Sequence, residues 1–341
     1  MKSIYLVRNG AADRAFEVRE TAMPTPTDGQ VLIKVEAFGL NYADVMARLG
    51  MYDDAPPLPA VLGYEVVGRV TALGAGVSNV KIGDRVVAMT RFGGYAEYAI
   101  ASAQALGVIP DAMPAGEATA LATQYITAYH AACEQVRLQE GDRVLIHAAA
   151  GGVGIALVQL AKAAGCIIYG TAGSDAKLEF LTELGVDFPI NYQKQDWAKV
   201  ITELRGDAGI DVIFDSIGGA SVAKGIKLLA SGGRMVSYGA AEMSSGNKKS
   251  LLQTLKVAAG FGIYSPIQLL TSSKAFIGIN MLRIADNKPH IVQRCTAAVI
   301  QLHAEGVAKP FVGGTFAAEA IAEAHDFLAS RASIGKVVCV W

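Results

Sequence analysis

The chain has 341 residues, with 30 Lys and Arg against 31 Asp and Glu, so its net charge is -1. At roughly 150 residues per domain this length predicts two domains, and a near-neutral charge argues against nucleic acid as a partner. Hydrophobic residues make up 52% of the chain, which excludes intrinsic disorder. The N-terminus does not resemble a signal peptide, and the four cysteines form no disulfide or zinc-knuckle spacing. We therefore expect a soluble, reduced, cytoplasmic protein.

The first part of the chain has the pattern of a β-rich domain. β-branched runs at 31–38, 66–73 and 85–89 are bounded by Gly, Pro and Asp, which predicts strands. After about residue 123, short apolar runs alternate with helical segments. The expected strands cover 144–149, 167–172, 212–216 and 234–239, and the expected helices cover 152–165, 175–185 and 220–233. This alternation predicts βαβ units and a parallel sheet.

The last part of the chain returns to a different pattern. Two amphipathic stretches at 290–305 and 317–329 precede a final apolar run at 336–341, which predicts two helices and a strand. The predicted fold class is α/β, with a β-rich domain over 1–123, an inserted domain over 124–270 and a return to the first over 271–341. The last strand of the inserted sheet is expected near 275–280.

The glycine-rich sequence VLIHAAAGGVG at 144–154 is the sharpest motif. A strand enters a tight turn and a helix leaves it, and backbone N–H groups at such a helix start suit a pyrophosphate. Gly151 lacks a side chain where the phosphate must approach, and Gly154 lets the helix pack on the strand. Gly152 and Val153 are also expected to bind the cofactor. Ala149 replaces the first glycine of the usual GxGxxG, but the surrounding βα units supply the required context. The motif predicts dinucleotide binding, with a purely structural turn as the alternative.

The end of the second predicted strand bears on the choice of dinucleotide. An NAD site has an acidic residue roughly 20 residues past the glycine motif, whereas here the strand runs into Gly173 and Ser174. Lys177, one helical turn further on, is placed to meet a 2′-phosphate, although it could also be a solvated helix lysine. Asp175 is either a first-turn helix residue or a ribose ligand. These residues favour NADPH over NADH.

Four segments together resemble the medium-chain dehydrogenase/reductase superfamily. They are AAAGGVGIALVQLAK (148–162), GLNYADVMARLGMY (39–52), LPAVLGYEVVGRV (58–70) and DSIGG (215–219). Within the superfamily the chain is similar to the zinc-free quinone oxidoreductases, and 246–282 further resembles the vesicle amine transport protein 1 homologues. The resemblance implies a GroES-like substrate domain interrupted by a Rossmann domain, an active site in the cleft between them, and a homodimer paired through the strand near 275–280.

The zinc ligands of the related alcohol dehydrogenases are absent at the matching positions. Asn41 replaces the first cysteine, Tyr64 replaces the histidine, and Thr123 falls near the last cysteine. Glu65 and Asp44 remain, but zinc in proteins prefers thiolate and imidazole partners for a carboxylate. We therefore expect no metal, and a zinc alcohol dehydrogenase is disfavoured.

Without a Lewis acid an unactivated alcohol is a poor substrate. A quinone or an α,β-unsaturated carbonyl is already electrophilic and can accept a hydride from the nicotinamide. By resemblance, Asn41, Tyr52 and Tyr64 surround the nicotinamide and the acceptor carbonyl, with structural roles as the alternative. The resemblance also carries over further cofactor-binding residues: Thr127, Tyr129, Tyr192, Ser216, Tyr238, Gly239, Gly278, Asn280 and Arg331. No residue has the pattern of an obligatory general base.

One other class of function stays open. The vesicle-protein resemblance is compatible with a cofactor-binding adaptor of low turnover. The stretch 257–273 is uncharged and follows Lys248, Lys249 and Lys256, a pattern found in segments that lie on a membrane surface. The same stretch is also compatible with a helix over the cleft mouth or at a subunit interface, and Pro266 would interrupt a long helix.

Overall fold

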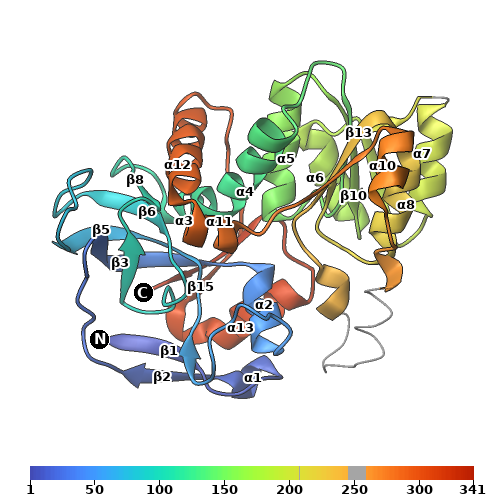
Figure 1. Cartoon of the computed structure of the whole chain (residues 1–341). Helices are drawn as coiled ribbons and strands as arrows, with labels where there is room; N and C mark the ends of the chain where they lie inside the picture. The colour runs from blue at the N-terminus through green and yellow to red at the C-terminus, as the bar shows by residue number, and fades with distance from the viewer. Residues whose placement is uncertain (207, 245–258) are drawn as a thin grey trace. The chain divides into compact units, whose positions relative to one another are not determined.

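The computed structural model describes residues 1–206, 208–244 and 259–341 (Figure 1). The chain divides into a first unit, Met1–Ile126 with Met281–Trp341, and a second unit, Thr127–Asn280. The sequence boundaries were placed at 123 and 270. The second division falls later because strand β14 (Ala275–Gly278) pairs with β13 of the second unit. Lys248, Lys249 and Lys256 of the predicted surface segment lie outside the described residues.

Strand β3 is the centre of the main sheet in the first unit. It pairs with β5, β7 and β16, all antiparallel, and the sheet order is β15-β16-β3-β5-β6-β8 with β7 also on β3. The strands are β3 (Gln30–Leu40), β5 (Glu65–Leu73), β6 (Arg85–Met89), β7 (Tyr98–Ser102), β8 (Leu106–Val108), β15 (Val312–Ala317) and β16 (Lys336–Val340). A smaller sheet has the order β2-β1-β4, with β1 (Lys2–Leu6), β2 (Phe16–Glu20) and β4 (Ala60–Val61).

Helices and helical turns, most of them short, pack around these sheets. They are α1 (Ala12–Ala15), α2 (Tyr42–Arg48), α3 (Ala115–Ala120), the π-helical η1 (Leu121–Tyr125), α11 (Met281–Asn287), α12 (Pro289–Ala304), the 3-10 turn η4 (Ala318–Ala320) and α13 (Ile321–Ala329). Helix α13 contacts α1 and α2, beside strands β1 and β2 in Figure 1. Phe38, Tyr95 and Val337 lie fully buried in the core of this unit, so the C-terminal strand completes a core that begins near residue 4.

The second unit is a six-stranded parallel sheet in the order β11-β10-β9-β12-β13-β14. The elements are α4 (Ile126–Tyr129), the π-helical η2 (His130–Gln135), β9 (Arg143–Ile146), α5 (Gly152–Ala163), β10 (Ile167–Ala172), α6 (Asp175–Leu184), β11 (Phe188–Asn191), α7 (Trp197–Arg205), β12 (Ile210–Asp215), α8 (Ala220–Leu228), β13 (Leu229–Ser237), the 3-10 turn η3 (Ala241–Ser244), α10 (Pro266–Ser272) and β14. This is the order of doubly wound dinucleotide-binding sheets, whose ligands bind at the carboxyl ends of the strands.

One sequence prediction of this unit is wrong. The helix expected over 220–233 ends at Leu228, and strand β13 starts at the next residue. Leu229 aligns with Ile210 of β12, and the register then jumps so that Arg234 aligns with Val212. Gly232, with a φ of 82°, lies in this irregular stretch. The glycines therefore mark a bulge within a strand and not the end of a helix.

Within the described residues, no helix is both long enough and apolar enough to cross a bilayer.

A buried ion pair joins three strands of the first unit. Lys336 at the start of β16 and Glu65 at the start of β5 both have fully buried side chains, and the Lys336 ammonium donates to Oε1 of Glu65. The ammonium also donates to the carbonyl of Leu40 (3.1 Å) at the end of β3 and to Oδ1 of Asn41 (3.0 Å). All three hydrogens of the ammonium therefore have acceptors.

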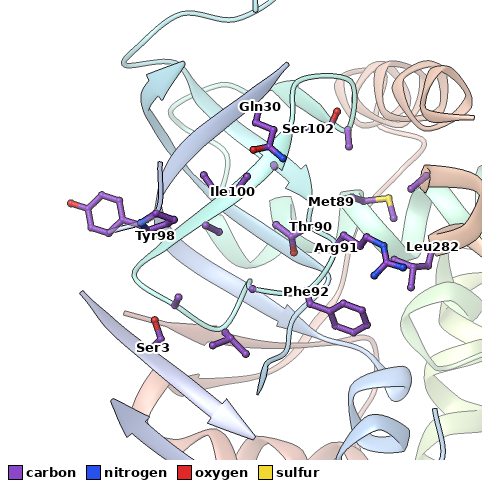
Figure 2. A pocket seen from close by; sticks show the side chains of 18 of the residues that line it. Ser3, Gln30, Met89, Thr90, Arg91, Phe92, Tyr98, Ile100, Ser102 and Leu282 are labelled. Atoms are coloured by element: carbon purple, nitrogen blue, oxygen red, sulfur yellow. The ribbon is translucent and has the colours of Figure 1, made fainter. Parts of the chain in front are cut away.

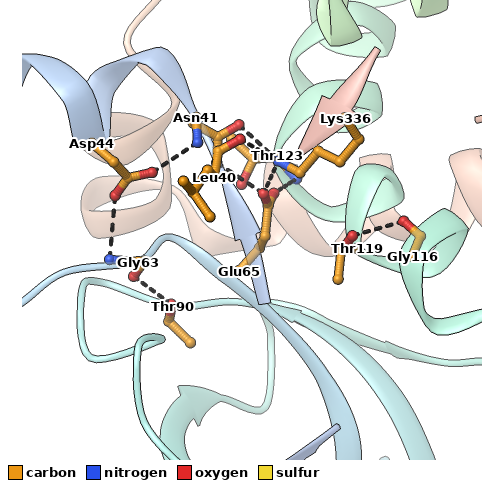
Figure 3. A network of polar contacts seen from close by, with 10 residues as sticks. All are labelled: Leu40, Asn41, Asp44, Gly63, Glu65, Thr90, Gly116, Thr119, Thr123 and Lys336. Atoms are coloured by element: carbon orange, nitrogen blue, oxygen red, sulfur yellow. Dashed lines mark hydrogen bonds and ion pairs between the residues drawn. The ribbon is translucent and has the colours of Figure 1, made fainter. Parts of the chain in front are cut away.

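The Glu65 carboxylate is equally well satisfied. Its Oε1 accepts from the Asn41 side-chain amide (2.8 Å), and its Oε2 accepts from the backbone N–H of Thr123 in η1 (2.9 Å). Figure 3 shows these groups converging on the carboxylate from separate segments. Because both charges are out of water, each depends on the other to remain buried.

We expect Lys336→Met to lower the free energy of unfolding by about 3–5 kcal/mol, because it leaves the Glu65 carboxylate buried without a cation. Urea denaturation measures the difference. The matched control is Lys2→Met, which removes the exposed pair of Lys2 with Glu319 and should cost at most about 1 kcal/mol. The double variant Lys336→Met/Glu65→Gln should recover part of the loss. Equal losses for Lys336→Met and Lys2→Met would contradict this account.

Candidate functional site

The glycine-rich loop lies between β9 and α5, as the sequence predicts. The backbone N–H of His147 donates to Phe214 of β12 (3.0 Å), and that of Ala149 donates to Thr171 of β10 (3.0 Å). These bonds hold the loop to the strands on either side of β9. Ala148 between them has a φ of 51°, a strained conformation for a residue with a Cβ. The loop is thus held in one shape by its neighbours.

Gly154 is required by packing, and Gly151 to Val153 are half-exposed at the start of α5. A Cβ on Gly154 would lie 2.4 Å from the carbonyl oxygen of Ala148 and 2.7 Å from the Cα of Ala149, so only glycine fits there. The N-cap residue Gly151 provides no side-chain cap for the first turn of α5. The backbone N–H groups of the first turn of α5 suit a pyrophosphate, and the loop therefore fits a dinucleotide.

The residues predicted to select the dinucleotide lie together after β10 and β11. Ser174 caps α6 by accepting from the backbone N–H of Lys177 (3.4 Å), and the Lys177 side chain is half-buried. A Cβ on Gly173 would lie 2.7 Å from the Tyr192 hydroxyl, so the tyrosine ring lies directly against that glycine. Gly173, Ser174, Lys177 and Tyr192 come from two separate segments of the chain, and the structure brings them to one edge of the sheet.

Asp175, the possible ribose ligand, is held by other side chains. Its carboxylate accepts from the Asn191 amide (2.9 Å) and from the ammonium of Lys194 (2.5 Å). The hydrogen bond from Lys194, followed by that from Asn191, keeps the Asp175 pKa below its usual value. Sequence reasoning missed Lys194, although it lies two residues after Tyr192 and adds a second cation beside Lys177's helix.

Other predicted cofactor residues follow the carboxyl ends of β12, β13 and β14. A Cβ on Gly239 would lie 2.8 Å from the Ser216 carbonyl oxygen, and the backbone N–H of Tyr238 donates to the carbonyl of Asp215 (3.0 Å). Gly278 is the last residue of β14, Asn280 lies two residues further on, and both are exposed. Since the strands are parallel, these residues share one edge with the glycine-rich loop.

The three remaining predicted cofactor residues are not in the segments that follow the strands of the parallel sheet. Thr127 is buried and Tyr129 half-buried in the short helix α4. Arg331 is exposed after α13 in the first unit, with a φ of 60°. Their roles remain predictions.

A buried polar cluster lies beside the glycine-rich loop, at the carboxyl ends of the central strands. The sequence did not reveal this cluster. His147 and Asp215 are buried, and Nδ1 of His147 lies 3.0 Å from the Thr171 hydroxyl. The Asp215 carboxylate accepts from the N–H groups of Ile217 (2.9 Å) and Gly218 (2.7 Å) and from the Ser221 hydroxyl. Burial lowers the pKa of His147, so the imidazole is neutral. The cluster ties together the carboxyl ends of β9, β10 and β12.

In the first unit, Asn41 begins helix α2 and takes part in the buried ion-pair network. Its side-chain oxygen accepts from Lys336, and one of its two amide hydrogens goes to Glu65. Asn41 and Thr123, which stand at or near zinc-ligand positions of related dehydrogenases, therefore both donate to a carboxylate that already pairs with an ammonium. The Asn41 amide, the Tyr64 phenol and the Thr123 hydroxyl are not among the thiolate, imidazole and carboxylate groups that zinc prefers.

Asp44 and the two predicted tyrosines lie beside this network. Asp44 accepts from the backbone N–H of Asn41 (2.8 Å) and of Gly63 (3.3 Å), and burial raises its pKa to about 7. The Tyr52 ring stands edge-on to that of Tyr64 at 6.2 Å. The buried Tyr64 hydroxyl makes no hydrogen bond of normal length within the part of the chain that the structure describes. Burial raises the pKa of both phenols, so each is protonated at neutral pH.

Two family models match the chain. Residues 27–111 match the alcohol dehydrogenase GroES-like domain, and residues 152–288 match the zinc-binding dehydrogenase family. The name of the second family mentions zinc, but the name describes the family as a whole. In this chain the Asn41 amide and the Lys336 ammonium contact Glu65, and neither group is a usual zinc ligand.

A curated relative matches over the full length. The human synaptic vesicle membrane protein VAT-1 homolog is 36% identical over 342 residues, which covers 100% of this chain and 86% of the relative.

Solved structures agree with this match. The Escherichia coli quinone oxidoreductase complexed with NADPH superposes with a TM-score of 0.86 at 26% identity, covering 100% of both chains. The CurK enoyl reductase superposes with a TM-score of 0.84 at 26% identity, covering 99% of this chain and 98% of that one. The predicted GroES-like and Rossmann domains are thereby confirmed. The chain belongs to the medium-chain dehydrogenase/reductase superfamily, close to the VAT-1 homologues, and is an oxidoreductase of the quinone oxidoreductase type.

Proposed function

We propose that the protein is a zinc-independent, NADPH-dependent reductase of quinones or of activated C=C bonds in α,β-unsaturated carbonyl compounds. The observation that carries this proposal is the Lys336 ammonium, which donates hydrogen bonds to Asn41 and Glu65. By the sequence resemblance, Asn41 aligns with the first zinc-binding cysteine of the related dehydrogenases. The similar structures of an NADPH-bound quinone oxidoreductase and an enoyl reductase support both acceptor classes.

The second unit would bind the cofactor along the carboxyl edge of its sheet. The N–H groups of Gly152, Val153 and Gly154 at the start of α5 suit the pyrophosphate. Lys177 would meet the 2′-phosphate, since phosphates form strong hydrogen bonds with ammonium groups. Asp175 is already bonded to Asn191 and Lys194, so it offers the ribose hydroxyl less than a free carboxylate would. This arrangement favours NADPH over NADH.

A bound NADPH supplies a hydride to an electrophilic carbon of the acceptor. The contribution of the first unit is to bind the acceptor oxygen, on which negative charge develops as the hydride arrives. Hydrogen-bond donors fixed in a dry site stabilise such charge without reorganisation. No metal is needed if the carbon is already activated by a conjugated carbonyl.

Tyr64 and Tyr52 are the proposed donors to that oxygen. Their raised pKa values keep them protonated, so they act as hydrogen-bond donors and not as bases. Asn41 has a smaller proposed role, because its oxygen and one amide hydrogen are used by Lys336 and Glu65. Its second amide hydrogen is the group that could orient the nicotinamide amide or the substrate.

We further propose a cytoplasmic homodimer. β14 is an edge strand of the parallel sheet, and Ile263, Ile267 and Leu270 nearby in the chain are 95%, 70% and 76% exposed. A second copy paired along β14 would extend the sheet and cover apolar surface.

The alternative is a low-turnover adaptor, in which the exposed side chains of Ile263, Ile267 and Leu270 would contact a membrane surface instead of a second copy. Light scattering at the mass of one chain, together with flotation on liposomes, would favour that alternative.

Lys177→Ala should weaken NADPH binding by about ten- to a hundredfold, because one charge-assisted hydrogen bond is lost. NADH binding should hardly change, because NADH lacks the 2′-phosphate. Fluorescence titration of both nucleotides measures the two dissociation constants. The matched control is Lys199→Ala on α7, an exposed helix lysine of the same unit, which should alter neither. Equal losses for both nucleotides in Lys177→Ala would make Lys177 a structural residue.

Tyr64→Phe or Tyr52→Phe should lower the turnover of an enone or quinone by about ten- to a thousandfold, as loss of an oxyanion donor does. The dissociation constant of NADPH should stay the same, since neither hydroxyl is assigned to the cofactor. Steady-state kinetics gives the first quantity and titration the second. Full turnover in both variants would exclude the phenols as the donors.

A further inference from the structure

A cavity of about 550 Å³ lies wholly within the first unit (Figure 2). Its walls are strand β7, the loop at 89–93, helix α11 and the N-terminal segment around Ser3 and Thr21. Its volume is in the range of sites for small organic ligands, which is roughly 300–1,000 Å³. Neither the glycine-rich loop nor the network around Glu65 contributes to it.

The chemistry of the walls suits an apolar occupant. Val61, Met89, Phe92, Ile100 and Leu282 line the cavity together with several alanines. Several of the polar side chains in the walls already have partners within the fold. Ser3 pairs with the Thr21 hydroxyl (3.0 Å), Thr90 donates to the Gly63 carbonyl (2.9 Å), Gln30 accepts from the Thr27 hydroxyl (2.8 Å), and Arg91 pairs with Asp286 (2.8 Å). A ligand would therefore gain from burying hydrocarbon and little from offering polar groups.

Phe92 connects this cavity with the proposed oxyanion donor. Its ring lies 5.1 Å from that of Tyr64, and its φ of 67° is a strained conformation for an aromatic residue, of a kind that persists where the surroundings hold it. Arg91 fixes the loop next to it, because its Nε donates to both carboxylate oxygens of Asp286 on α11 (2.8 and 3.0 Å). Phe92 thus lines the cavity and also packs against the Tyr64 ring.

We propose that this cavity binds the apolar substituent of the acceptor whose carbonyl oxygen Tyr64 holds. The inference rests on the proposed reductase function and specifies its substrate class. The preferred acceptors are enones or quinones with an extended hydrocarbon substituent, and small or charged-tail acceptors are poor substrates.

The test is a homologous series of 1-alken-3-ones, from methyl vinyl ketone to a ketone with a heptyl group. Each methylene that enters the cavity should raise kcat/KM by about three- to fourfold, from the free energy of burying a CH₂ group, until the cavity is filled. Two variants narrow the cavity at half-exposed wall positions: Ala285→Phe on α11 and Ile100→Trp on β7. Both should abolish the gain for long ketones and leave methyl vinyl ketone within about twofold of its original kcat/KM, because its single methyl group does not need the cavity.

Ala322→Phe is the matched control, because it enlarges a half-exposed helix alanine of the same unit, on α13, that does not line the cavity. It should retain the full dependence on chain length. A flat series in the unchanged protein, or a series that neither cavity variant alters, overturns the proposed cavity role while leaving the reductase function in place. No turnover of any enone or quinone overturns the reductase function, and this inference with it.

Discussion

The ion pair of Lys336 and Glu65 is the constraint on which the first unit depends. A buried ammonium needs three acceptors and a counter-charge, and these come from β3, β5 and the residue that begins α2. The C-terminal strand can therefore dock in one register only. Because Tyr64 precedes Glu65 and Asn41 follows Leu40, that register also sets the backbone positions of the proposed catalytic residues.

The same pair supports the proposal that the enzyme works without a metal. In a zinc site, ligands direct lone pairs at a cation, and the cation's charge holds the segments together. Here the cation is a side chain of the protein, and Asn41 and Thr123 direct N–H groups at the carboxylate. The segments remain linked, but the charge is fully used and is not available to polarise a substrate. In the proposed reaction the acceptor is therefore already activated, and the Tyr52 and Tyr64 phenols stabilise the charge that develops on its oxygen.

Much of the second unit could be predicted from the sequence because its signals are local. The strand expected at 167–172 has those bounds in the structure, and the helix expected from Gly152 begins there. The sequence predicts that Gly154 allows close packing of helix on strand. The structure agrees, because a Cβ at this position would clash with the backbone of Ala148 and Ala149. The error at 220–233 arose because Gly232 and Gly233 resemble a helix end, whereas pairing with β12, a tertiary contact, makes that stretch part of a strand.

The network around Glu65 could not be predicted in the same way. A lysine at the start of a final apolar strand normally points to solvent, and nothing near Lys336 in sequence indicates that residues 65 and 41 surround it. Nothing in the sequence around His147 indicates its partner, and only the parallel sheet reveals that it joins Thr171 beside the glycine-rich loop. In both places the deciding contacts join residues far apart in the chain, which no local pattern records.

The central claim is hydride transfer to an activated acceptor without a metal. The most direct measurement follows deuterium into the product of an enone from NADPH that is labelled at C4 on the transferred face, using protein treated with a strong chelator. The account predicts deuterium on the β-carbon of the saturated ketone at the same rate as in untreated protein. Loss of activity on chelation with recovery on added zinc, or a product without deuterium at that carbon, would contradict it.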